Sequence, residues 1–105
     1  KTAIILDDLI GSGTTIGRAV RACREHGADR VYAGATHGLF VGDAERVLAD
    51  PELTGLAVCD TVPPFRLSDR VVREKITILN GAGLVAEAIH RIHTGGSVVD
   101  LLALE

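Results

Sequence analysis

Short apolar runs alternate with helix-like stripes along this sequence, and this alternation constrains the fold more than any other feature. Four runs have the apolar character of short strands: residues 3–6, 31–36, 56–59 and 76–79. Apolar residues also recur at helical spacing in two stripes, which are Ile16, Ala19, Val20 and Cys23, and Val85, Ala88, Ile89 and Ile92. Strands that alternate with helices favour βαβ units. We therefore predict an α/β fold, a three-layer sandwich with a mostly parallel, twisted sheet and helices on both faces.

The remaining segments complete this prediction as one domain over residues 1–105. Residues 43–49 are predicted to form a short helix, and residues 98–102 a last helical turn or a short helix. Residues 61–74, which include Pro63-Pro64, are predicted to be an irregular connection. The sequence contains no Met and opens with Lys1-Thr2 directly before an apolar run. We expect it to be a piece of a longer polypeptide.

Composition excludes several classes of partner. The net charge of −3 and the aromatic content of 3% argue against a nucleic-acid surface, which needs cations and stacking faces. No apolar run approaches the length of a membrane span. Cys23 and Cys59 stand far apart among apolar residues, as buried thiols do, which favours a reducing cytoplasm.

The segment most informative about function joins the first predicted strand to the first predicted helix. Two carboxylates are followed by a turn of small residues: Asp7, Asp8, Gly11, Ser12, Gly13, Thr14 and Thr15. Backbone N–H groups at a helix start favour an anion, glycines let a phosphate approach closely, and the hydroxyls add donors. The carboxylates suit sugar hydroxyls or a divalent cation instead. The pattern predicts a sugar-phosphate site.

The turn lacks the marks of two common phosphate-binding loops, and one structural alternative stays open. No Lys follows the glycines, so it is not a Walker loop, and the glycine spacing misses the dinucleotide fingerprint. A capped helix whose glycines serve only the turn remains a structural alternative. No activated nucleophile is visible, so no catalytic residue is predicted, and the metal ligands stay unassigned. His37, at the end of the second predicted strand, is expected to have a structural hydrogen-bonding role.

The turn resembles the phosphoribosyl-diphosphate (PRPP) loop of type I phosphoribosyltransferases and PRPP synthetases. Three further stretches are similar to segments of the ribose-phosphate diphosphokinases, the PRPP synthetases themselves: residues 35–40 (ATHGLF), residues 59–63 (CDTVP), and residues 84–93 with Gly96-Ser97-Val98. Gly11 and Thr14 depart from the usual loop, where Asp or Ser and then Gly are common. The resemblance covers nearly the whole chain.

The resemblance implies a phosphoribosyltransferase-like fold and the C-terminal half of a ribose-phosphate diphosphokinase. Such enzymes make PRPP and AMP from ATP and ribose 5-phosphate by diphosphoryl transfer, with Mg²⁺. By position, residues 11–15 would hold the 5-phosphate, and Asp7 with Asp8 would face the ribose hydroxyls. ATP would be bound mainly by the other half, and the enzyme would be a cytoplasmic homo-oligomer. A PRPP-using phosphoribosyltransferase and a non-catalytic regulatory homologue of the synthetase remain alternatives.

Overall fold

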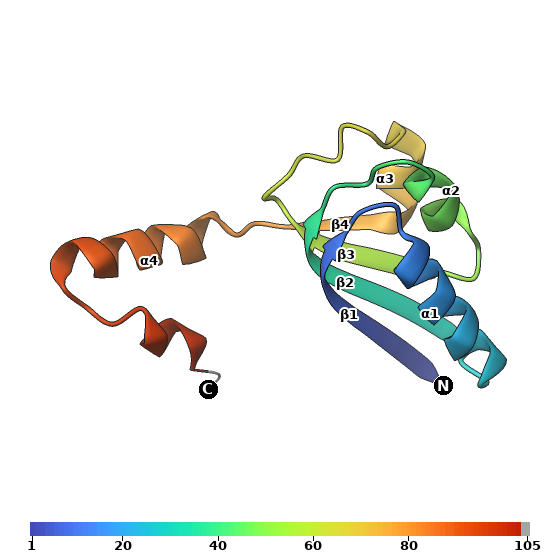
Figure 1. The fold of residues 1–105 in the computed structure, drawn as a ribbon, viewed down its shortest axis with the longest axis horizontal. Helices are drawn as coiled ribbons and strands as arrows, with labels where there is room; N and C mark the ends of the chain where they lie inside the picture. Colours follow the sequence, from blue (N-terminus) through green and yellow to red (C-terminus); the bar gives the residue numbers. More distant parts are fainter. Residues whose placement is uncertain (104–105) are drawn as a thin grey trace.

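A four-stranded parallel sheet forms the centre of the computed structural model, which describes residues 1–103. Its strands lie side by side in chain order: β1 (Thr2–Ile10), β2 (Arg30–Gly38), β3 (Gly55–Cys59) and β4 (Ile76–Leu79) (Figure 1). All three strand pairings are parallel. The predicted α/β class and parallel sheet are therefore confirmed.

Within residues 1–103, four α-helices and one short turn of 3-10 helix follow or join the strands. They are α1 (Thr14–Glu25), α2 (Ala44–Ala49), α3 (Asp69–Lys75), α4 (Ala82–Thr94) and the 3-10 turn η1 (Val99–Leu102). The apolar stripe of α1 packs inward through Ile16 and Val20, as its spacing predicted. Together with the sheet, α1, α2 and α3 enclose a core that includes Val31, Leu48 and Val58.

Only one face of the sheet is covered within residues 1–103. A right-handed crossover between neighbouring parallel strands places its connecting helix on a fixed side. Because the strands follow one another in order, α1, α2 and α3 all fall on the same side. The opposite face leaves Ile4 69% exposed and Leu6 80% exposed. The described residues thus supply two of the three predicted layers, and helices cover one face rather than both.

A helix in the segment predicted to be irregular is the main error in the predicted elements. Ser68 caps α3, because its side chain accepts a hydrogen bond from the backbone N–H of Val71. The N–H of Ser68 also donates to Glu45 Oε1 of α2 over 2.6 Å. Hydrogen bonds from Ser68 hold the pKa of Glu45 below its ordinary value. The helix is short and mostly charged, so its apolar periodicity is too weak to predict it.

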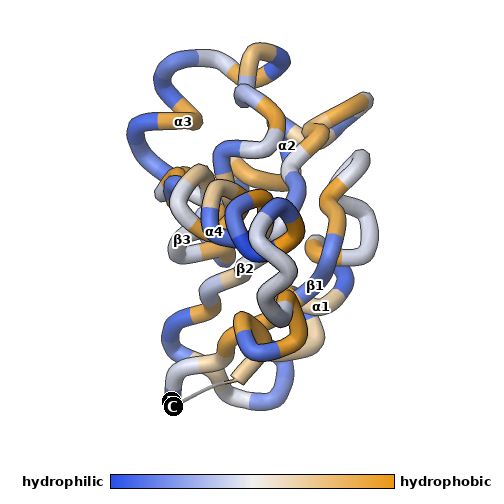
Figure 2. Tube along the Cα trace, turned by 90° about the vertical axis from the view of Figure 1, so that its left-hand side faces the viewer, coloured by the Kyte–Doolittle hydropathy of each residue, from blue (hydrophilic) through white to orange (hydrophobic). Residues whose placement is uncertain are grey.

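The last helix stands away from the sheet (Figure 1). Apolar and polar residues alternate along its turns (Figure 2). Ile89 and Ile92 of its predicted apolar stripe are 61% and 71% exposed. The predicted last helical turn is present as η1. Across residues 1–103, no helix combines the length and the apolar character that crossing a membrane requires.

Candidate functional site

The turn between β1 and α1 leaves the start of the helix open. Gly13 is the N-cap residue, adopts the left-handed conformation with φ of 81°, and makes no side-chain cap hydrogen bond. The first backbone hydrogen bond of the helix runs from the N–H of Gly17 to the carbonyl of Gly13 over 2.8 Å. The N–H groups of residues 14–16 therefore have no partner inside the helix. No acidic side chain occupies the first turn, so an anion would meet only the favourable end of the helix dipole.

A cavity of about 220 Å³ lies at this helix start. It is lined by Asp7, Leu9, Ile10, Gly11, Ser12, Gly13, Thr14, Thr15 and Ile16. Six of the seven predicted site residues, all but Asp8, therefore share one cavity. Two of the hydroxyls already contact each other, with Ser12 Oγ 3.0 Å from Thr14 Oγ1. The cavity combines unpaired N–H groups, hydroxyls and one carboxylate.

Only one of the two neighbouring aspartates lines the cavity. We expected them just after the strand, but β1 continues through both of them to Ile10. Successive side chains of a strand point to opposite faces. Asp7 accordingly lines the cavity, whereas Asp8 does not. Asp7 Oδ1 also accepts a hydrogen bond from the N–H of Asp8 over 2.8 Å, which orients the Asp7 carboxylate.

The number of carboxylates at the cavity determines which kind of metal binding this site could support. No group of three or more His, Cys, Asp or Glu side chains gathers as a metal cage within residues 1–103. Magnesium, however, is commonly held by one or two carboxylates, with water and substrate phosphates supplying the other ligands. Asp7 beside a phosphate-sized cavity fits that mode of binding.

A second loop, residues 39–42, holds the first one in place. The N–H groups of Leu39 and Val41 donate to the carbonyls of Ile10 and Gly11 over 2.9 and 3.0 Å. Phe40 anchors this second loop, since its side chain is 2% exposed while its backbone has a φ of 53°. A left-handed conformation is uncommon for a bulky residue and is kept only where the surroundings enforce it. Leu39 and Phe40 belong to residues 35–40, the stretch that resembles a segment of the ribose-phosphate diphosphokinases. This stretch therefore helps to hold the turn that lines the cavity.

Val47 of α2 packs against the turn without lining its cavity, and the sequence did not reveal this contact. A Cβ atom added to Gly13 would lie 3.3 Å from Val47 Cβ, so the turn packs tightly against α2. The two residues are distant in sequence, and nothing local to Val47 signals the contact.

His37 has the structural hydrogen-bonding role expected of it. Its Nδ1 lies 2.7 Å from Thr61 Oγ1, which ties the ends of β2 and β3 together. Nearby, Asp60 Oδ1 accepts a hydrogen bond from the N–H of Gly81 over 2.9 Å, which fixes the chain just before α4. These contacts stabilise the loops at the carboxyl ends of the strands, where the cavity also lies.

Comparison with known proteins gives one consistent answer. Residues 1–103 match the model of the family described as "Phosphoribosyl synthetase-associated domain". The chain is 40% identical over 99 residues to a ribose-phosphate pyrophosphokinase of Haemophilus ducreyi, covering 93% of this chain and 30% of that protein. It is 41% identical over 101 residues to the ribose-phosphate pyrophosphokinase of Caldanaerobacter subterraneus, covering 96% of this chain and 31% of that protein.

A solved structure agrees with these relatives. The crystal structure of phosphoribosylpyrophosphate synthetase from Mycobacterium smegmatis superimposes with a TM-score of 0.80 at 34% sequence identity, covering 91% of this chain and 31% of that one. The chain thus spans about a third of the length of the proteins it matches. Its expected place in the C-terminal half of such a protein stays a prediction.

Proposed function

The chain belongs to the phosphoribosyl synthetase-associated domain family, and on this premise we propose that it is the ribose 5-phosphate-binding part of a ribose-phosphate diphosphokinase. The observation that carries the proposal is the uncapped start of α1, which opens on a cavity lined by hydroxyls and by one carboxylate. A structural cap, the alternative interpretation of this turn, would use its own side chains to satisfy the helix N–H groups. Here the N-cap residue Gly13 has no side chain, and among residues 1–103 no other side chain accepts a hydrogen bond from the N–H groups of residues 14–16.

In the proposed site, the 5-phosphate lies at the start of α1. The N–H groups of residues 14–16 and the hydroxyls of Ser12 and Thr15 donate to its oxygens. Gly11 and Gly13 keep side chains out of the path by which the phosphate approaches. The departures at Gly11 and Thr14 from the usual loop leave the backbone donors in place.

The ribose then extends toward the carboxylates. Asp7 accepts hydrogen bonds from the ribose hydroxyls within the cavity. Asp8, on the other face of β1, has its effect from outside the cavity, by adding negative charge near the sheet edge. When bound, Mg²⁺ would be held by Asp7 together with substrate oxygens and would neutralise phosphate charge.

In the proposed reaction, the anomeric hydroxyl of ribose 5-phosphate attacks the β-phosphorus of ATP. A new bond forms between that hydroxyl oxygen and the β-phosphorus, the bond from the β-phosphorus to the bridging α–β oxygen breaks, AMP leaves with that oxygen, and the hydroxyl proton passes to solvent. The substrate is its own nucleophile, so this segment needs to supply position rather than a nucleophile. The proposal also includes ATP as the second substrate. It further includes a homo-oligomeric enzyme that works in the cytoplasm.

A titration with ribose 5-phosphate tests the binding role. Backbone amide signals of residues 13–16 are expected to shift in ¹⁵N-labelled protein as ribose 5-phosphate is added, because their N–H groups gain an acceptor. Ribose without phosphate is expected to leave these signals nearly unchanged. Shifts of similar size with both sugars, or none at residues 13–16 with ribose 5-phosphate, would contradict the proposal.

The 105-residue chain alone is expected to produce no AMP from ATP and ribose 5-phosphate. It spans about a third of the length of the related pyrophosphokinases, and it supplies only the sugar-phosphate site in our proposal. AMP release measured by chromatography checks this expectation, with an intact ribose-phosphate pyrophosphokinase as the positive control. Robust turnover by the chain alone would show that it also carries the ATP site.

Replacing Asp7 by Asn is expected to weaken ribose 5-phosphate binding about tenfold, since a hydrogen bond to a charged group contributes roughly 1.5 kcal/mol or more. Asp8→Asn is the matched control, because it removes the same charge from the opposite face of β1. The control should change affinity less than about threefold, the effect of a screened charge. Calorimetric titration of both variants checks which of them loses more affinity for ribose 5-phosphate. A larger loss of affinity with Asp8→Asn than with Asp7→Asn would contradict the assignment of Asp7 to the sugar.

A further inference from the structure

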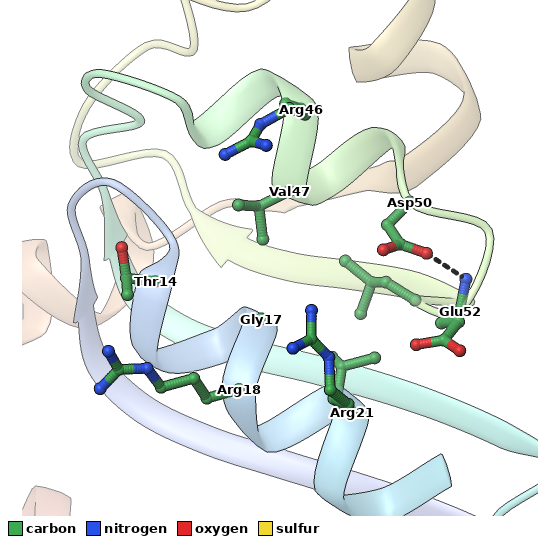
Figure 3. A pocket seen from close by; sticks show the side chains of 10 residues that line it. Thr14, Gly17, Arg18, Arg21, Arg46, Val47, Asp50 and Glu52 are labelled. Carbon is green, nitrogen blue, oxygen red and sulfur yellow. Dashed lines mark hydrogen bonds between the residues drawn. The ribbon is translucent and has the colours of Figure 1, made fainter.

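We propose that the cavity between α1 and α2 is a second anion site, which takes the phosphate group of a small phosphorylated ligand. This cavity has a volume of about 320 Å³ and shares only Thr14 with the cavity at the β1–α1 turn. Three arginines line it, Arg18 and Arg21 from α1 and Arg46 from α2. Figure 3 shows Arg21 pointing from α1 toward α2, Arg46 on the facing side of α2, and Arg18 extending along α1 toward the side of Thr14.

The packing of the two helices brings these arginines together. Arg18 and Arg21 are three residues apart, so they lie on one face of α1. Gly17 lies beside them, and a Cβ atom there would come within 3.3 Å of Val47 Cγ1. Without that side chain α2 approaches α1 closely. This approach places Arg46 across the cavity from Arg18 and Arg21 (Figure 3).

The guanidinium groups are available to a ligand. Among the described residues, neither Arg18 nor Arg21 forms an ion pair. Arg46 Nη2 lies 3.3 Å from Asp43 Oδ2, but both side chains are highly exposed, and such a pair exchanges readily for a better partner. Arg24, also on α1, differs because it donates to the carbonyl of Glu52 and is fixed by the fold.

The other end of the cavity limits what can bind. Asp50 and Glu52 line it on the side away from Thr14 and Arg18 (Figure 3). Asp50 Oδ1 accepts a hydrogen bond from the N–H of Glu52 over 2.9 Å, which holds the Asp50 carboxylate in place. Two carboxylates would repel a polyanion, whereas hydroxyl groups could donate to them. The planar fork of a guanidinium matches a phosphate group. One phosphate group on a hydroxyl-bearing ligand therefore fits both ends.

Titration of the protein with inorganic phosphate tests this second site, with backbone amide signals as the readout. Two separate sets are expected to shift: residues 13–16 at the turn, and residues 18, 21 and 47 at the cavity. The double variant Arg21→Gln/Arg46→Gln should weaken the second response about tenfold or more and leave the first within about twofold. Both arginines are exposed on helices, so Gln should preserve the fold.

Arg73→Gln is the matched control, because Arg73 is an exposed arginine on α3 that does not line the cavity. It should leave both responses unchanged. Phosphate shifts confined to residues 13–16 in the unaltered protein would overturn the second site. So would an equal weakening by Arg73→Gln, which would show general charge attraction alone. The signals of residues 13–16 are followed in the same titration. A missing shift there would count against the proposed ribose 5-phosphate site and not against the second site.

Discussion

Replacing Gly38 by alanine is expected to destabilise the protein by about 2–3 kcal/mol, at the upper end of the usual cost of overpacking a core. A Cβ atom at Gly38 would lie 2.5 Å from two ring carbons of Phe40. The Phe40 ring is 2% exposed, and its backbone already has an uncommon left-handed conformation, so neither can move aside. Urea denaturation should show the loss, and the melting temperature should fall by roughly 10–20 °C.

Gly34→Ala on the same strand is the matched control. Its Cβ would lie 3.2 Å from Leu6 Cδ2, and that side chain is 80% exposed and free to turn away. The control should therefore cost less than about 1 kcal/mol. Equal destabilisation by the two substitutions would mean that the Phe40 anchor has no special weight, and that the second loop does not depend on it.

Replacing Thr15 by Val is expected to lower the affinity for ribose 5-phosphate by about ten- to a hundredfold. The substitution keeps the branched shape but removes a hydroxyl that lines the cavity beside the proposed phosphate. A hydrogen bond to a charged group contributes roughly 1.5–3 kcal/mol, which corresponds to that range of affinity. Thr15 is exposed, and Thr and Val have similar helix propensities, so stability should hardly change.

Much of this site could be predicted because its parts are close in sequence. The apolar run, the small-residue turn and the stripe of α1 are local patterns, and the structure places six of the seven predicted residues on one cavity. The end of β1 is harder to predict, because two carboxylates after an apolar run are typical of a strand end, yet β1 continues through Asp7 and Asp8 to Ile10. Pairing with β2 decides that point, and the partner of Asp7, which is Ala35, lies 28 residues further along the chain.

The parts that could not be predicted depend on long-range packing. Val47 reaches Gly13 only after α2 has folded back over α1, and the left-handed backbone of Phe40 follows from burial of its ring. The number of layers in the fold could not be predicted from the sequence either. Helical stripes show that helices exist, but the order of the strands decides which face they cover.

The most direct test of the proposed function compares ribose 5-phosphate affinity, measured by calorimetry, with melting temperature in the unaltered protein and in Thr15→Val. Thr77→Val, the same substitution at an exposed position of β4 away from the cavity, serves as the control. We expect Thr15→Val to lose about ten- to a hundredfold in affinity with an unchanged melting temperature, and Thr77→Val to bind normally. Normal binding by Thr15→Val together with a collapsed melting temperature would show that the turn is a structural cap and not a phosphate site.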